Sequence, residues 1–174
     1  MERATKDFGR LDVLINNAGI VSTDPDLEAD LKSTLDTNAI GAAVTTYAFV
    51  PLLKKSKNPR VIHVSSGLGS IAGRTDPKNP YAAFNGLSYR MSKAAMNMLA
   101  AQNKHEFAPW GAKVWTMCPG YVVTNLTGEA DRENRKNTGA LSSETSAQFL
   151  HQIIRGERDA DDGKFVHVGG VYPW

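Results

Sequence analysis

Three residues have types and spacing that could carry out chemistry: Ser66, Tyr89 and Lys93. Tyr89 and Lys93 stand four residues apart in the stretch SYRMSK, so on a helix they share one face. An ammonium group beside a phenol favours the phenolate, which predicts a lowered pKa for Tyr89 and an acid or base that works near neutral pH. The Ser66 hydroxyl could hydrogen-bond the oxygen that gains or loses the proton. These groups predict proton transfer to a carbonyl oxygen. Reduction of that carbonyl would also need a hydride donor, which these three residues do not supply.

A tyrosine followed by a lysine four positions later is also a common chance pattern. An ordinary pair on a helix surface is therefore the competing interpretation. Tyr47, Tyr81 and Tyr121 do not compete for the role, because Pro or Asn stands four residues after each of them. Tyr121 is interpreted either as a wall of a substrate pocket or as part of the core.

Alternating strands and helices are predicted to position these residues. Four short apolar runs predict strands, at 11–16, 60–66, 112–119 and 163–170. Helical periodicity predicts helices at 27–51, at 88–107 with Ser88 as the N-cap, and at 144–155, with a long loop at 67–87. Runs that are apolar without strict alternation, above all 11–16, predict parallel strands buried on both faces. Ligands of such α/β sheets collect at the carboxyl ends of the strands, here after Asn16, Val64 and Met117.

Composition narrows the class of protein. With 174 residues, 41% of them apolar, the chain is long enough for one domain. Its 20 basic and 18 acidic residues nearly cancel, which predicts neither nucleic acid nor a membrane surface as a partner, and the basic cluster at 54–60 is interpreted as a solvated loop. The single cysteine excludes an internal disulfide, and the four histidines lack metal-ligand spacing. With no signal peptide and no apolar run of membrane-spanning length, a cytoplasmic location is expected.

Five segments resemble, in order, motifs of the short-chain dehydrogenase/reductase family: LDVLINNAG, DTNAIG, RVIHVSSGLG, SYRMSK and CPGYVVT. Their combination, which extends from Phe8 to Thr124, is specific although each segment is not. The tail GKFVHVGGVYPW is most similar to the carbonyl-reductase branch. The resemblance implies a Rossmann-type, doubly wound parallel sheet. It also implies an oxidoreductase that transfers a hydride between a nicotinamide cofactor and a small carbonyl or alcohol substrate.

The resemblance also assigns catalytic roles. Tyr89 matches the acid/base, and Lys93 matches the residue that lowers its pKa and holds the nicotinamide ribose. Ser66 matches the hydroxyl that orients the substrate, whereas Ser65 is expected to be structural. Asn38 matches the asparagine that holds a water in a proton relay. The alternative for Asn38 is a buried amide that bonds helix backbone.

Cofactor contacts follow from the same resemblance. Asn17, Ala18 and Gly19 match the turn that lies against the adenine-side ribose. Val122 and Thr124 match contacts to the nicotinamide carboxamide and the phosphates, and Tyr89 and Lys93 complete the predicted set. NADP(H) is expected because the carbonyl-reductase branch generally uses it, with NAD(H) as the alternative.

Two departures from the family pattern qualify the resemblance. The segment between Ser66 and Tyr89 is longer than is common, so we expect it to line or cover the substrate pocket and to favour a monomer or a weak homo-oligomer. The family's T-G-x-x-x-G-x-G turn, which binds the pyrophosphate, has no match. Residues 1–174 are therefore expected to be the C-terminal part of a single Rossmann domain, incomplete at its N-terminal half. Two hypotheses stay open. In the first, the chain is part of a complete reductase. In the second, it is a truncated and inactive fragment, or an interaction module, with an exposed sheet edge.

Overall fold

The computed structural model of the protein describes residues 2–174, and a five-stranded sheet lies at its centre. The strands lie side by side in chain order: β1 (Val13–Asn16), β2 (Arg60–Val64), β3 (Lys113–Met117), β4 (Phe165–His167) and β5 (Gly170–Tyr172). The first four are parallel, and β5 runs antiparallel to β4. The predicted α/β fold is confirmed. The fourth predicted strand is wrong in extent, since the chain turns back after His167 and pairs with itself.

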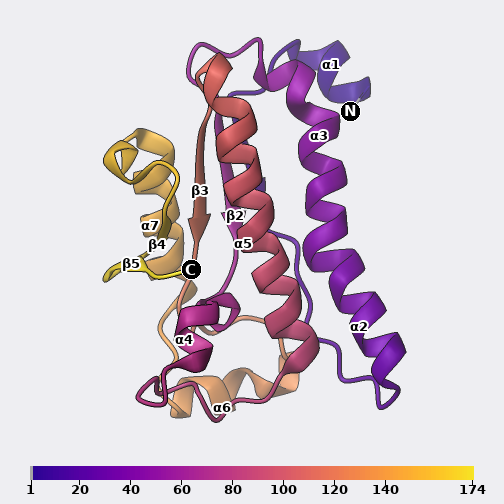
Figure 1. Cartoon of the computed structure of the whole chain (residues 1–174), viewed down its shortest axis with the longest axis vertical. Coiled ribbons are helices and arrows are strands. Elements are labelled where there is room, and N and C mark those ends of the chain that lie inside the picture. The colour runs from indigo at the N-terminus through magenta and orange to yellow at the C-terminus, as the bar shows by residue number, and fades with distance from the viewer. Residues whose placement is uncertain (1) are drawn as a thin grey trace.

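Helices cover the sheet and link its strands (Figure 1). One continuous rod joins α2 (Leu27–Leu35), a π-helical segment (Asp36–Ile40) and α3 (Gly41–Leu53), close to the helix predicted at 27–51. The other long helices are α5 (Leu87–Phe107) and α7 (Ser143–Arg155). Short helices that the sequence did not reveal are α1 (Glu2–Phe8), α4 (Ile71–Thr75) and α6 (Arg132–Asn137). Helical 3-10 turns occupy Gly67–Gly69, Ala108–Trp110, Glu129–Asp131 and Asp159–Asp161.

Two predictions about helix boundaries and loops are corrected. Helix α5 begins at Leu87 with Gly86 as its N-cap, so Ser88 lies inside the first turn, where it is buried and caps nothing. The segment 67–87 is not one long loop, because it contains a 3-10 turn and α4. In that segment the side chain of Ser70 accepts a hydrogen bond of 2.9 Å from the Gly73 amide and so caps α4.

Each face of the sheet has its own apolar core. Val61 of β2 and Val114 of β3 pack with Leu53 and Phe107 on the side of α3 and α5. The next residues along these strands, Ile62 and Trp115, point the other way. They form the second core with Met117 and Val166 of the sheet and with Phe149 and Ile153 of α7. Successive residues of the central strands are therefore buried on both faces, which explains their apolar runs.

The first strand departs from this pattern because it lies at the edge of the sheet. β1 pairs with β2 alone among the strands in residues 2–174. Its residues Val13, Leu14 and Ile15 are only half-buried, so the prediction that this strand is buried on both faces is wrong. An edge strand has a hydrogen-bonded neighbour on one side, and its open side leaves the flanking side chains partly accessible.

A buried polar network fixes the end of β1. The amide nitrogen of Asn16 lies 2.8 Å from Thr46 Oγ1 and 3.2 Å from His63 Nδ1, and His63 Nε2 lies 3.1 Å from Asn103 Oδ1. Burial lowers the pKa of His63 to about 4, so the imidazole is neutral at pH 7. The contacts fit a ring that carries its proton on Nε2. The first amide of NNAG is thus structural.

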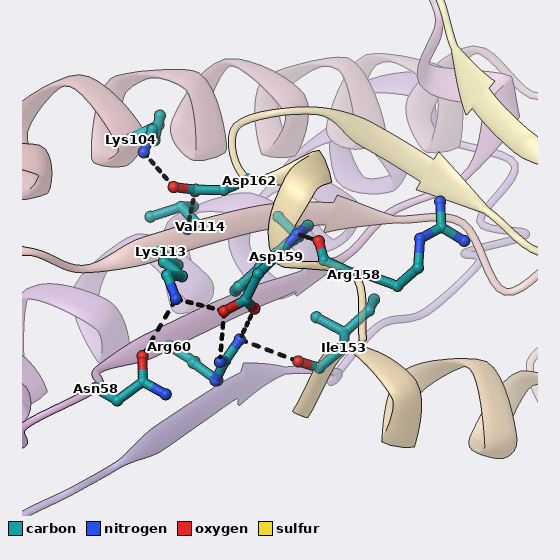
Figure 2. A network of polar contacts seen from close by, with 10 residues as sticks. Asn58, Arg60, Lys104, Lys113, Val114, Ile153, Arg158, Asp159 and Asp162 are labelled. Atoms are coloured by element: carbon teal, nitrogen blue, oxygen red, sulfur yellow. Dashed lines mark hydrogen bonds and ion pairs between the residues drawn. The ribbon is translucent and has the colours of Figure 1, made fainter. Parts of the chain in front are cut away.

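An ion-pair network fixes the opposite, amino-terminal end of the central strands (Figure 2). The Arg60 guanidinium donates to both Asp159 oxygens, at 2.5 and 3.1 Å, and Lys113 donates to the same carboxylate. Asp162 pairs with Lys104 at 2.5 Å. Asp159 and Asp162 both lie in the connection between α7 and β4. Their bonds therefore hold that connection against β2, β3 and α5.

Candidate active site

The candidate site lies beyond the carboxyl ends of β2 and β3, where α4 and α6 gather in Figure 1. β2 ends at Val64 and leads directly into Ser65 and Ser66. Helix α5 passes beside this exit, and the ammonium of Lys93 donates a 2.9 Å hydrogen bond to the Val64 carbonyl oxygen. The strand end and the helix therefore bring Ser66, Tyr89 and Lys93 together, as the sequence predicted.

Tyr89 is buried, with 8% of its surface exposed, and lines the same two cavities as Ser66. Burial raises the pKa of Tyr89 to about 12, while Ser66 and the charge of Arg135 act in the opposite direction. The predicted lowering by Lys93 is wrong for this structure. The Lys93 ammonium lies 5.7 Å from the centre of the Tyr89 ring, and its hydrogen bond goes to backbone. Tyr89 is therefore a protonated phenol at neutral pH.

Lys93 is 4% exposed, and burial lowers its pKa to about 8, which leaves the ammonium mostly charged at pH 7. The turn after β1 approaches it closely. A Cβ on Gly19 would stand 3.5 Å from Lys93 Nζ and 3.3 Å from Asn38 Oδ1. A Cβ at position 19 would thus be in ordinary contact with the lysine and slightly too close to Asn38.

A second glycine holds the exit of β2 against α5. A Cβ on Gly69 would stand 2.6 Å from the Lys93 backbone carbon, closer than any real Cβ contact. Ser65 Oγ donates to Asn97 Oδ1 at 2.6 Å and contacts the Lys93 carbonyl oxygen at 3.2 Å. The Asn97 amide in turn donates to the Gly69 carbonyl oxygen at 3.1 Å. Ser65 is therefore structural, as expected, and sets the position of its neighbour Ser66.

Asn38 lies in the π-helical segment and is fully buried. Its Oδ1 accepts from the Ile20 amide at 2.8 Å, and its Nδ2 donates to the Ile20 carbonyl and to Ser92 Oγ, each at 2.9 Å. These bonds use both amide hydrogens, so the geometry favours the alternative role as a buried amide. Asn38 ties the turn after β1 to α5 beside Lys93. The relay role stays a prediction.

A cavity of about 530 Å³ opens beside Lys93. It is lined by Ser66 and by six of the seven predicted cofactor-binding residues: Asn17, Gly19, Tyr89, Lys93, Val122 and Thr124. Ala18 does not line it and is exposed. The structure thus gathers residues from three separate strand ends around one hollow.

A second cavity of about 470 Å³ adjoins the first. Its aromatic lining residues come from distant parts of the chain: Tyr81, Phe84, Tyr121 and Tyr172, besides Tyr89. Tyr121 is therefore a pocket wall, and the long segment after Ser66 lines the pocket as expected. Ser66 and Tyr89 line both cavities, so their hydroxyls stand where a molecule in one hollow would meet a molecule in the other.

Sequence reasoning missed the C-terminal wall and Arg135. The tail binds α4 through Ser70 Oγ, which donates to the Pro173 carbonyl oxygen at 2.8 Å. Tyr172 and Pro173 consequently line the second cavity. Arg135 lines both cavities and is buried, although its basic neighbours Arg132 and Lys136 are exposed. No spacing in the sequence separates it from them.

Comparisons with known proteins show the family to which the chain belongs. Residues 1–135 match the model of the short chain dehydrogenase family. The chain is 32% identical to short-chain dehydrogenase/reductase tropE of Talaromyces stipitatus over 181 residues, which cover 94% of this chain and 66% of that protein. It is 34% identical to C-signal of Myxococcus xanthus, over 95% of this chain and 94% of that protein.

A solved structure of a carbonyl reductase is also similar to this chain. The crystal structure of NADPH-bound carbonyl reductase from chicken fatty liver superposes with a TM-score of 0.78 and 28% identity, over 99% of this chain and 69% of that one. The chain thus spans about two thirds of tropE and of the chicken protein, and nearly all of C-signal. Since 135 of its 174 residues match the family model and its structure is similar to a carbonyl reductase, the chain belongs to the short chain dehydrogenase family.

Proposed function

We propose that the chain carries the catalytic part of an NADP(H)-dependent oxidoreductase, which reduces a ketone or aldehyde to an alcohol or catalyses the reverse reaction. The observation that carries this proposal is the position of Ser66 and Tyr89, which line both cavities, while Lys93 lines the first. Two adjoining hollows with a proton donor between them suit a reaction in which a carbonyl substrate meets a second bound molecule.

Tyr89 is the proposed acid. The phenol is protonated at neutral pH, so it can donate its proton to a carbonyl oxygen as the carbonyl carbon receives a hydride, although the burial that raises its pKa to about 12 opposes that transfer. The Ser66 hydroxyl, which lines the same cavities as the phenol, would hold that oxygen. Of the buried cations, Arg135 acts to lower the pKa of Tyr89, so its charge would stabilise the phenolate left behind. For Asn38 we propose a role in positioning Lys93, with the water relay as the untested addition.

The cavity beside Lys93 fits a nicotinamide group. Its wall combines a buried ammonium, a turn kept free of side chain at Gly19, and the hydroxyl of Thr124. Val122 and Thr124 would contact the nicotinamide carboxamide and the phosphates, Lys93 would hold the nicotinamide ribose and Asn17 would lie against the adenine-side ribose, and the bound group would supply or accept the hydride. NADP(H) is preferred to NAD(H) because the similar chicken reductase is an NADPH-bound protein.

A second candidate function rests on the match to C-signal, which covers nearly all of that protein. A family member of this extent supports keeping the alternative of an inactive domain or interaction module. No helix in the described part of the chain has the length and apolar character needed to cross a membrane. The cytoplasmic location, the monomeric or weakly oligomeric state, and the status of residues 1–174 as part of one Rossmann domain belong to the proposal.

Replacing Tyr89 with phenylalanine tests the proposal. We expect Tyr89→Phe to lose carbonyl-dependent NADPH oxidation by at least about a hundredfold, the scale of general acid catalysis, while NADPH affinity changes little. Tyr47→Phe is the matched control, because Tyr47 bonds Glu106 on the surface far from both cavities. Near-normal turnover by Tyr89→Phe would overturn the assignment of the acid. NADPH binding without turnover in the unaltered protein would favour the second candidate.

A further inference from the structure

Arg135 is a buried cation without an ion-pair partner among the described residues. Only 7% of its surface is exposed, and the described Asp and Glu side chains form no salt bridge with it. Its Nε donates to the Val122 carbonyl oxygen at 3.0 Å, and Nη1 donates to Thr127 Oγ1 at 3.0 Å. Nη2 has no hydrogen-bond partner in residues 2–174. Nη2 is not among the fully buried atoms that lack a partner, and Arg135 lines both cavities, so this donor is open to them. The Asp131 carboxylate, whose pKa is lowered chiefly by the Thr127 hydrogen bond and least by the charge of Arg135, compensates the cation only from a distance, so a bound anion would add to its stabilisation.

The guanidinium is also held rigidly. Its carbon stands 4.8 Å from the centre of the Tyr121 ring, so the ring supports one face while Val122 and Thr127 fix two nitrogens. The Thr127 hydroxyl in turn donates a hydrogen bond of 2.5 Å to Asp131 Oδ2. A planar cation fixed in this way keeps Nη2 in place, which is the arrangement that recognises an oxyanion.

The surroundings limit the shape of the ligand. Arg135 lines the cavities together with Ser66 and Tyr89. The rest of the 470 Å³ cavity is largely apolar and aromatic, with Leu68, Phe84 and Tyr172 in its wall. Asp76 also lines this cavity, but it is exposed and its Oδ1 accepts from the Lys78 amide at 2.9 Å. The buried part of the pocket thus combines an apolar wall with one cation.

We propose, building on the proposed function, that Arg135 binds a carboxylate of the carbonyl substrate. The substrate class is then an aromatic or apolar ketone or aldehyde that carries a carboxylate, with its carbonyl held at Ser66 and Tyr89. The same guanidinium chemistry would suit a phosphate of the cofactor, since Arg135 also lines the cavity beside Lys93. The experiment below separates these two sources of the oxyanion.

Two probes that differ in one charge provide the test. Phenylglyoxylate is an aromatic keto acid, and methyl phenylglyoxylate is its neutral ester. Calorimetric titration of the protein is expected to show the acid binding at least about tenfold more tightly than the ester, the scale of a charge-assisted hydrogen bond. Added salt should weaken the binding of the acid and leave the affinity for the ester nearly unchanged. Equal affinities, or no binding of either probe, would overturn the inference.

Variants assign the preference to the residue. Arg135→Gln is expected to remove the preference for the acid, and Arg135→Lys to keep part of it because the charge stays. Lys136→Gln is the matched control, since Lys136 is an exposed neighbour paired with Glu133. Circular dichroism checks folding; if Arg135→Gln does not fold, Arg135→Lys and the comparison of acid with ester in the unaltered protein decide.

The same titrations distinguish the cofactor from the substrate. If Arg135→Gln weakens NADPH binding tenfold and leaves the preference for the acid intact, the guanidinium serves the cofactor and the inference fails. Absence of NADPH-dependent turnover would count against the proposed function, yet the preference for phenylglyoxylate would still report on Arg135. The two failures are thus distinguishable.

Discussion

Replacing Gly69 with alanine should disturb the site through backbone packing alone. Gly69 ends the 3-10 turn that follows Ser66, and its α-carbon lies against the backbone of α5 at Lys93. A methyl group there would stand 2.6 Å from the Lys93 carbon, whereas ordinary contact begins at 3.4 Å. The obstacle is helix backbone, which cannot rotate away, so the turn must move by about 0.8 Å.

The size of the effect follows from this displacement. Overpacking of a rigid contact costs about 1–3 kcal/mol of the free energy of unfolding, which lowers the Tm by roughly 2–12 °C in a domain of this size. The shift also carries Ser66 away from Tyr89. Because misplacement of about 1 Å can cost a hundredfold in rate, we expect kcat to fall at least about tenfold while NADPH affinity changes less.

The assay pairs Gly69→Ala with a change in the same turn. Gly67→Ala is the control, because its Cβ would meet the end of the Tyr172 side chain at 3.2 Å, and a side chain can move a few tenths of an ångström. Thermal melting and NADPH oxidation are measured for both variants. A Gly69→Ala protein as stable and as active as the original, or one less affected than Gly67→Ala, would refute the reasoning.

Two further predictions concern stability and pH. His63 has a pKa lowered by burial to about 4 in the folded state against 6.5 when unfolded, so the unfolded state binds more protons between these values and stability falls as pH drops through them. We expect a loss of about 2 kcal/mol between pH 7 and pH 4.5, measured by urea unfolding, and a smaller loss in His63→Gln; equal losses would contradict this. Asp159→Asn should cost about 2 kcal/mol at pH 7, because it leaves the buried Arg60 guanidinium without its counter-ion. Asp12→Asn, which affects an exposed pair, should cost less than about 1 kcal/mol, and equal urea midpoints for the two variants would argue against a stabilising role of the Arg60–Asp159 ion pair. The hydrogen bonds from Arg60 chiefly hold the pKa of Asp159 at about 2, so its contribution should be present above pH 3.8 and be lost as pH falls through the folded value.

Local sequence determined the elements and the approximate place of the site. Apolar runs predicted the first three strands within about two residues, and for β2 and β3 burial on both faces explains the continuous apolar pattern. The four-residue spacing of Tyr89 and Lys93 placed both on one turn of α5, since helical periodicity is a local property. The strand ends then predicted where these residues meet Ser66. Short helices such as α4 and α6 escaped prediction because few residues define their periodicity.

Only the tertiary structure decided the electrostatics and the shape of the pocket. The pKa of Tyr89 depends on burial by segments distant in sequence, and that term outweighs the neighbours that lower it. Arg135 looks like its exposed basic neighbours in the sequence, and packing against Tyr121 and Val122 makes it a buried cation. Tyr172 reaches the same pocket because β5 turns back along β4. Desolvation and long-range packing sum contributions from the whole chain, so no local pattern encodes them.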